Sequence, residues 1–252
     1  MRAKFAWNFW SLATEVYEFV AIAALVAQPC YALRFKEDLR QPGLRVPITA
    51  NHQLFMDAVE LGREVVWLHT YGERMADPLK GRPKGPPRLP KPEAPSIPAG
   101  GEISGSSSQT LPETLDYNIS TKRLSIGGGY IDNVSKQVWE YEVSGKNILR
   151  QWFSSRRQDR SRPLIGDKRP PSPLDGIQPG HWLPEYTTDL MNLLHVIGRL
   201  VKLESKQKEL LDRICKEVQF NYSTLHADGA LTSPPRAPGS KIGAAISQPS
   251  FI

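Results

Sequence analysis

Residues 188–218 read TDLMNLLHVIGRLVKLESKQKELLDRICKEV, and this stretch decides how the rest of the chain can fold. Its apolar residues recur every three or four positions, the spacing of one face of an α-helix. They are Leu190, Leu193, Leu194, Ile197, Leu200, Val201, Leu210, Leu211 and Ile214. Thr188 and Asp189 are typical of a helix N-terminus. The pattern predicts one or two amphipathic helices whose apolar face must be covered by the remaining chain.

Helical patterns also dominate the N-terminal part. Residues 5–28 are rich in Ala, Leu, Val and aromatic residues, and they predict a buried helix that ends at Pro29. A shorter helical piece is expected at 31–40, and a third helix at 53–69. Nine prolines then follow between positions 78 and 112, with Gly and Ser among them. Because such a composition buries little apolar surface, it predicts a flexible insert at 78–113.

Strand-like runs come after the insert. They are LDYNIS at 115–120, KRLSIGG at 122–128, YIDNV at 130–134 and VWEYEVSG at 138–145. Thr, Gly and Ser separate them, which predicts a small antiparallel sheet. The three glycines at 127–129 lack the spacing and the lysine of a phosphate-binding loop, so a hairpin turn or bulge is the expected role.

The positive charge of the chain is concentrated in one segment. The net charge is +6, and residues 146–170 alone hold eight basic and two acidic residues. The eight are Lys146, Arg150, Arg156, Arg157, Arg160, Arg162, Lys168 and Arg169, which we call the arginine arm. Ile148, Leu149, Trp152 and Phe153 fall on one helical face and predict the anchor of the arm in the core. On the same helical wheel, Lys146, Arg150 and Arg157 form a basic stripe.

Six of these eight residues are Arg, whose planar, multi-donor head group suits phosphate oxygens and the edge of guanine. The arm therefore predicts a contact with nucleic acid, although a solvated charged surface is the plainer interpretation. A second candidate set for backbone phosphates is Arg34, Lys36, Arg40 and Arg45, which could equally be an ordinary solvated helix face.

Other classes of site find little support. Cys30 and Cys215 are the only cysteines, and they lack the spacing of a zinc site or a disulfide framework, which fits a cytoplasmic protein. The apolar run 19–27 is shorter than the roughly 20 residues of a membrane span. The five histidines are isolated, and no nucleophile elbow occurs. We therefore expect no catalytic residues, no metal site and no membrane contact in this chain.

Four blocks, in this order, resemble a known family. They are RFKEDLRQPGLRVPIT, ELGREVVWLHTYGER, VWEYEVSGKNILRQWFSSRRQDRSRPLIGDKRPPSPLD and TTDLMNLLHVIGRLVKLE. Together they resemble the C-terminal specificity region of type ISP restriction-modification enzymes, which are adenine-specific DNA methyltransferases with restriction activity and serve in phage defence. The resemblance covers roughly residues 15–77 and 115–215 and leaves out the proline-rich insert.

The resemblance implies an α+β fold and a function in DNA target recognition. Residues 1–77 would pack on a methyltransferase domain, 114–220 would form the recognition module, and 221–252 would be a flexible tail. Double-stranded DNA and a methyltransferase domain or subunit are the implied partners, and S-adenosylmethionine would bind to that missing domain. The motifs of the family's catalytic domains do not occur in these 252 residues, so a fragment or a separately encoded subunit is implied. The alternative is a non-catalytic protein–protein interaction module whose arginine arm docks on an acidic partner.

Overall fold

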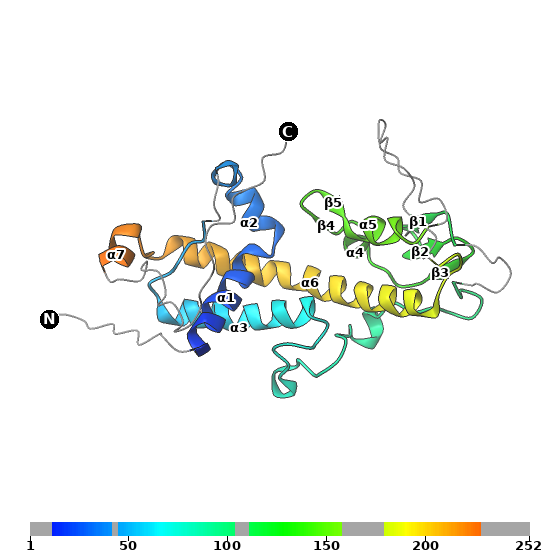
Figure 1. Cartoon of the computed structure of the whole chain (residues 1–252), viewed down its shortest axis with the longest axis horizontal. Helices are drawn as coiled ribbons and strands as arrows, with labels where there is room; N and C mark the ends of the chain where they lie inside the picture. Colours follow the sequence, from blue (N-terminus) through cyan, green and yellow to red (C-terminus); the bar gives the residue numbers. More distant parts are fainter. Residues whose placement is uncertain (1–11, 42–44, 104–110, 158–178, 228–252) are drawn as a thin grey trace, which may run out of the picture.

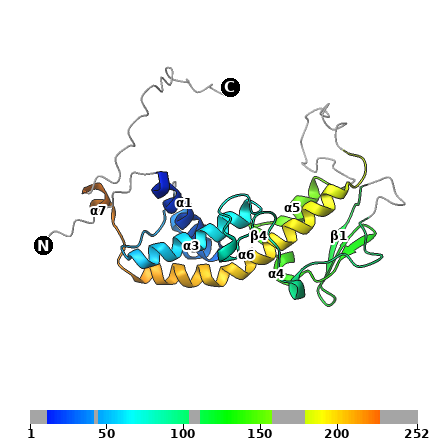
Figure 2. The same ribbon diagram turned by 90° about the horizontal axis from the view of Figure 1, so that it is seen from below.

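The computed structural model describes residues 12–41, 45–103, 111–157 and 179–227. One long helix, α6 (Pro184–Lys216), runs through most of the molecule, and the other elements pack along it in two groups (Figure 1). Viewed from below, α1 and α3 lie beside its C-terminal half and the strands beside its N-terminal half (Figure 2). The fold is α+β, as the sequence predicts. No helix in the described ranges is long and apolar enough to cross a membrane.

α6 is a single helix of 33 residues, about 50 Å long at 1.5 Å per residue. It begins at Pro184, four residues before the predicted start at Thr188. Proline fits the first position of a helix, where its missing N–H has no partner in any case. Three hydrophobic clusters follow one another along α6. From its N-terminal to its C-terminal end, α6 contributes Leu190, Leu194 and Ile197 to the first cluster, Val196, Leu200 and Leu203 to the second, and Leu210, Leu211 and Ile214 to the third.

The N-terminal helices cover the C-terminal half of α6. They are α1 (Leu12–Val26), α2 (Pro29–Arg34), the 3₁₀ turn Asp38–Arg40 and α3 (His52–His69). All three predicted helical regions contain helix in the described residues, although the second is split in two and residues 5–11 of the first lie outside the described ranges. α1 crosses α3 at Gly62, where an added Cβ would stand 1.6 Å from the carbonyl oxygen of Val20. The amide N–H groups of Gln53 and Leu54 donate to the side chain of Asn51, which caps the start of α3.

The proline-rich segment differs from the expected flexible insert. Residues 78–103 have defined positions and include the 3₁₀ turns Pro78–Lys80 and Lys91–Glu93. Trp67 Nε1 donates to the carbonyl of Pro83 at 2.9 Å, and the N–H of Leu89 donates to Nδ1 of His195 at 3.0 Å. These partners lie on α3 and α6, so side chains distant in the sequence satisfy the backbone of a segment that cannot form regular structure by itself. Residues 104–110 lie outside the described ranges.

The predicted antiparallel sheet is confirmed for three of its four runs. β1 (Leu115–Asn118), β2 (Arg123–Ile126) and β3 (Gly129–Ile131) pair in that order. Ile126 pairs with Gly129, so residues 127 and 128 form the predicted hairpin turn. Buried Leu124, Ile126 and Ile131 turn one face of the sheet toward the N-terminal half of α6.

The fourth run, 138–145, is not a strand of this sheet. Its first two residues end a short helix, α4 (Lys136–Trp139), because the Ser135 side chain caps that turn by accepting from the N–H of Val138. The rest forms a separate hairpin of β4 (Glu142–Val143) and β5 (Lys146–Asn147). Ser144 and Gly145 make its turn, with φ of 53° and 74°. α5 (Ile148–Ser154) follows directly.

The segment after α6 pairs with the segment before α3 through backbone hydrogen bonds. The N–H of Ala50 donates to Val218 and that of Phe220 donates to Ile48, each at 2.9 Å. α7 (Tyr222–Ala227) comes next, so the first residues of the predicted tail are helical. The remainder of that tail, 228–252, falls outside the described ranges.

Candidate nucleic-acid interface

The arginine arm begins on a hairpin and a helix that Asn147 ties together. Its side-chain oxygen accepts from the N–H of Arg150 at 2.9 Å and so caps α5. Its side-chain nitrogen donates to the carbonyl of Trp139 at 2.6 Å, at the end of α4. One side chain therefore fixes the direction in which α5 leaves the β4–β5 hairpin.

The inner face of α5 is the predicted anchor. Leu149 and Phe153 are buried in the cluster that contains the sheet, and Ile148 and Trp152 pack against it. Trp152 meets Trp182 edge-on with 6.1 Å between ring centroids, just before α6 begins. The aromatic anchor is confirmed, and it holds α5, where the arm begins, against the N-terminal end of α6.

The first two cations of the arm, Lys146 and Arg150, are exposed and lie on consecutive elements of the chain. Lys146 is on β5 and Arg150 on α5, so they do not share one helical stripe as the wheel predicted. The guanidinium carbon of Arg150 lies 5.1 Å from the ring centroid of Trp139, a cation–π distance. Trp139 in turn stacks on Tyr117 at 5.4 Å. Arg150 is thus held over an aromatic pair while its donors remain accessible to solvent.

Arg156 is oriented inward. Its Nη1 donates to the carbonyl of Trp152 at 2.9 Å and to Oγ of Ser155 at 3.2 Å, and its guanidinium carbon lies 4.2 Å from the Trp152 ring. Its Nε is buried and has no hydrogen-bond partner among the described residues. These contacts give Arg156 a packing role at the end of α5. Arg157 is half-buried, at the end of the described range.

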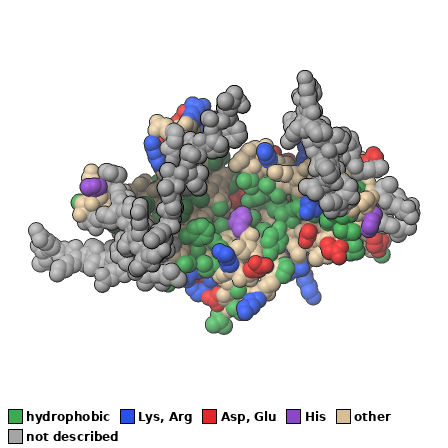
Figure 3. Space-filling view, viewed as in Figure 1, with side chains coloured by type: hydrophobic (Ala, Val, Ile, Leu, Met, Phe, Trp, Pro, Cys, Tyr) green, Lys and Arg blue, Asp and Glu red, His purple; other side chains and the backbone are tan. Residues whose placement is uncertain are grey.

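Among the described residues, no carboxylate pairs with the cations at the start of the arm. Within the described parts of the chain, Lys146, Arg150 and Arg156 form no ion pair. Arg160, Arg162, Lys168 and Arg169 belong to 158–178, outside the described residues, and they remain predictions. On the face in Figure 3, hydrophobic side chains are exposed across the middle, with lysine and arginine side chains above and below them.

The second candidate set is largely paired. Arg34 meets Asp212 at 2.6 Å, Arg40 meets Glu37 at 2.5 Å, and Arg45 meets Asp38 at 3.9 Å. Exposed pairs of this kind are weak and give way to a stronger anion. Lys36 is exposed on the same segment. This set therefore carries less uncompensated charge than the start of the arm.

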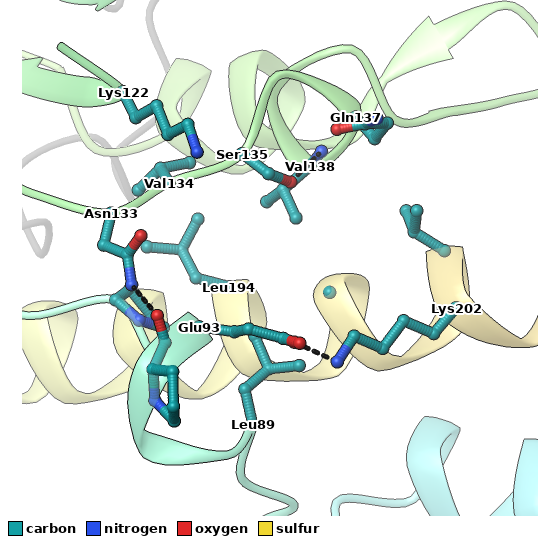
Figure 4. A pocket seen from close by; sticks show the side chains of 14 residues that line it. Leu89, Glu93, Lys122, Asn133, Val134, Ser135, Gln137, Val138, Leu194 and Lys202 are labelled. Atoms are coloured by element: carbon teal, nitrogen blue, oxygen red, sulfur yellow. Dashed lines mark hydrogen bonds and ion pairs between the residues drawn. The ribbon is translucent and has the colours of Figure 1, made fainter.

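A shallow pocket of about 340 Å³ lies between α6 and the connection from β3 to α4 (Figure 4). Glu93 pairs with Lys202 at its edge, and Asn133 donates to the carbonyls of Pro92 and Ala94 at 3.1 and 3.0 Å. Its floor includes Leu89 and Leu194. Of its other polar groups, Ser135 accepts from the N–H of Val138.

Two histidines have lowered pKa values, buried His195 on α6 and exposed His69 at the end of α3. Burial and the charge of Arg88 lower the pKa of His195 to about 4, so it is neutral and accepts from Leu89. Desolvation by neighbouring protein atoms also lowers the pKa of His69, although its side chain is exposed to solvent. Across the described residues, no three His, Cys, Asp or Glu side chains gather into a group that could hold a metal ion.

One basic segment, residues 74–88, was not identified from the sequence as a candidate binding surface. Residues 74–88 contain five basic residues and one acidic residue, a local excess that could have been counted. It was overlooked because the prolines of this stretch indicated disorder.

Comparisons with known proteins identify relatives of the chain. Residues 14–193 match the family model of the type ISP C-terminal specificity domain, and the match runs through 78–113, which the resemblance in the sequence left out. Among solved structures, the chain is similar to a nuclease-deletion mutant of the type ISP restriction-modification enzyme LlaGI, in complex with a DNA substrate mimic. The identity is 20% and the TM-score 0.41, over 79% of this chain and 13% of that chain, so this chain spans a small part of that enzyme. No curated protein matches.

Proposed function

Because this chain belongs to the type ISP C-terminal specificity domain family, we propose that it binds double-stranded DNA as the target-recognition module of a type ISP restriction-modification system. One observation carries the proposal: Lys146 and Arg150 are exposed, unpaired with carboxylates in the described residues, and mounted on a hairpin and a helix with a fixed relative direction. Such a pre-ordered pair binds a polyanion at little conformational cost.

The two cations have different tasks in this proposal. Lys146, a flexible point charge at the edge of the hairpin, contacts a phosphate and sets the position of the module. Arg150, oriented by the ring of Trp139, offers the planar fork that pairs with the O6 and N7 atoms of guanine. The remaining arm residues Arg157, Arg160, Arg162, Lys168 and Arg169 extend the contact along the DNA backbone. Arg156 supports the arm from within.

A methyltransferase domain or subunit is the proposed protein partner. α1 exposes Val16, Phe19 and Ile22, three apolar side chains at three-residue spacing, and Phe19 is 61% exposed. An apolar helix stripe left open to solvent favours a protein contact. Methyl transfer and S-adenosylmethionine binding belong to that partner, and residues 1–77 form the part of this chain that docks on it.

A mobility-shift titration of duplex DNA tests the assignment. The double variant Lys146→Gln/Arg150→Gln is expected to bind about tenfold or more weakly, and the slope of log affinity against log salt is expected to fall by about 0.9, because one phosphate contact, that of Lys146, is lost. Lys206→Gln, an exposed lysine on the distant half of α6, is the matched control and should bind as the wild type does.

Equal binding of the double variant and the wild type would remove the assignment. Competition separates the alternative, an acidic protein partner. If polyglutamate displaces the chain from DNA as well as unlabelled duplex does at equal charge, the arm recognises acidic surfaces in general and the target-recognition role fails.

A further inference from the structure

The basic segment 74–88, RMADPLKGRPKGPPR, forms a loop that projects from the end of α3. It lies below α6 in Figure 1, whereas the β4–β5 hairpin lies above α6. The loop is therefore a surface separate from the arginine arm.

The tip of this loop is rigidly held. Asp77 and Arg82 exchange backbone hydrogen bonds of 2.6 and 2.9 Å, which close residues 77–82 into a tight turn. The Arg82 side chain is buried at the base, where Nε donates to the carbonyl of Met75 at 3.0 Å and Nη1 donates to Glu60 at 2.6 Å. Lys80 adds a second ion pair to Glu60 at 2.9 Å. The tip is thus fixed to the middle of α3 by charged groups.

Leu79 stands at the end of this braced tip and is 99% exposed. A fully exposed leucine removes no apolar surface from water, so it does not stabilise the fold more than a polar residue would. A buried arginine and two ion pairs nevertheless hold the turn that presents it. Such an arrangement fits a side chain whose contact is made with a partner.

The surroundings of Leu79 indicate what the partner is. Arg74, Lys84 and Arg88 are exposed on the same segment, and within the described residues none of them pairs with a carboxylate. The core of a protein interface is depleted of charge, and Lys is rare there although Arg is common. Apolar wedges that enter the DNA minor groove combine a Leu, Ile, Met or Phe side chain with Lys and Arg contacts to the flanking backbone.

We propose that Leu79 is a wedge that inserts between base pairs of the bound duplex, with Arg74, Lys84 and Arg88 contacting the phosphates on either side. This inference rests on the proposed function, since it needs the chain to bind DNA. It adds a second DNA contact on the other side of α6. This contact would distinguish sequences by how easily a base step opens, and not by hydrogen bonds to base edges.

Unstacking a base step unwinds the duplex. In closed circular DNA, this unwinding changes the linking number after relaxation, so the target sequence need not be known. The full chain is bound to relaxed plasmid, topoisomerase I is added, and the linking number is read after protein removal. The wild type is expected to shift the linking number in proportion to bound protein. At equal occupancy, Leu79→Ala is expected to lose about half of the shift or more, and Leu79→Phe to keep it. Leu33→Ala, a 73% exposed leucine of α2, is the control and should behave as the wild type.

The two proposals fail in different ways. If the wild type does not bind the plasmid, the DNA-binding role is lost, and the wedge with it. If the wild type binds without changing the linking number, or if Leu79→Ala shifts it as much as the wild type does, only the wedge is overturned. If Leu79→Ala instead weakens binding to a methyltransferase protein and leaves the linking number unchanged, the tip is a protein contact and the wedge is again overturned.

Discussion

Buried Arg82 donates from Nη1 to Oε1 of Glu60 at 2.6 Å, which joins the loop after α3 to the middle of that helix. Glu60 also receives Lys80 at 2.9 Å. Burial by itself would raise the pKa of Glu60, but hydrogen bonds and charge from Arg82 and Lys80 outweigh it and lower the pKa to about 2. Glu60 is therefore ionised throughout the physiological range.

Arg82→Met is expected to lower the free energy of unfolding by about 1–3 kcal/mol, because it removes a buried donor from Glu60 and from the carbonyl of Met75. Urea unfolding followed by circular dichroism measures the change. Lys80→Met is the control, since Lys80 contacts the same carboxylate from an exposed position and should cost less than about 1 kcal/mol. An equal loss in the two variants would show that burial of Arg82 contributes nothing.

Gly62→Ala and Gly198→Ala test two close approaches of different kinds. A Cβ at Gly62 would stand 1.6 Å from a backbone carbonyl of α1, so two helices must separate, at a cost of about 3 kcal/mol. A Cβ at Gly198 would meet only a terminal methyl of Leu89 at 2.6 Å. That methyl can rotate away, and alanine favours the helix, so the net change should stay within about 1 kcal/mol. Thermal unfolding of both variants decides the order, and a milder effect at Gly62 would contradict the helix crossing.

Periodicity in the sequence predicts the helices well, because α3 and α6 bury long apolar stripes that repeat at helical spacing. It fails where a single polar side chain overrides a local pattern. Residues 138–143 alternate like a strand, yet Ser135 caps a helical turn and Trp139 ends it. The proline-rich segment was misjudged because its partners, Trp67 and His195, are far away in the chain. Composition alone carries no information about such contacts.

For the candidate site, the sequence predicts which residues anchor α5 but not how its arginines are oriented. A run of arginines after an aromatic helix face is visible in the sequence, and the anchor through Phe153 and Trp152 follows from spacing. The sequence does not reveal that Arg150 lies over Trp139 while Arg156 turns inward onto Trp152. Both arginines have the same chemistry, and only the packing around α5 separates an exposed contact from an internal support.

His195 makes stability depend on pH. Its pKa of about 4 in the folded protein lies below the value of about 6.5 expected in the unfolded chain. The unfolded state therefore binds more protons between these values, so this part of the stability is present above about pH 6.5 and is lost as the pH falls toward 4. Protonation would also take away the acceptor used by the N–H of Leu89.

His195→Gln should accordingly show a smaller fall in melting temperature between pH 7 and pH 5 than the wild type. Some fall will remain, because the pKa of His69 is lowered in the same direction. His181→Gln, which replaces an exposed histidine, is the control for the substitution itself, and its melting temperature at pH 7 should equal that of the wild type. If His195→Gln kept the wild-type pH dependence, His195 would not be the group that titrates.

Trp139→Leu separates the orientation of Arg150 from its charge. The indole supports the guanidinium at 5.1 Å, and its loss removes about 0.5–1 kcal/mol, so DNA affinity should fall about two- to fivefold. The slope of log affinity against log salt should stay unchanged, because no charge is removed. Tyr130→Leu is the matched control: Arg123 lies 3.7 Å from that ring, but it is paired with Asp132 at 2.6 Å, so DNA binding should not change. A fall in the salt slope of Trp139→Leu, or equal losses in both variants, would show that Trp139 supports the fold in general and does not orient Arg150 toward DNA.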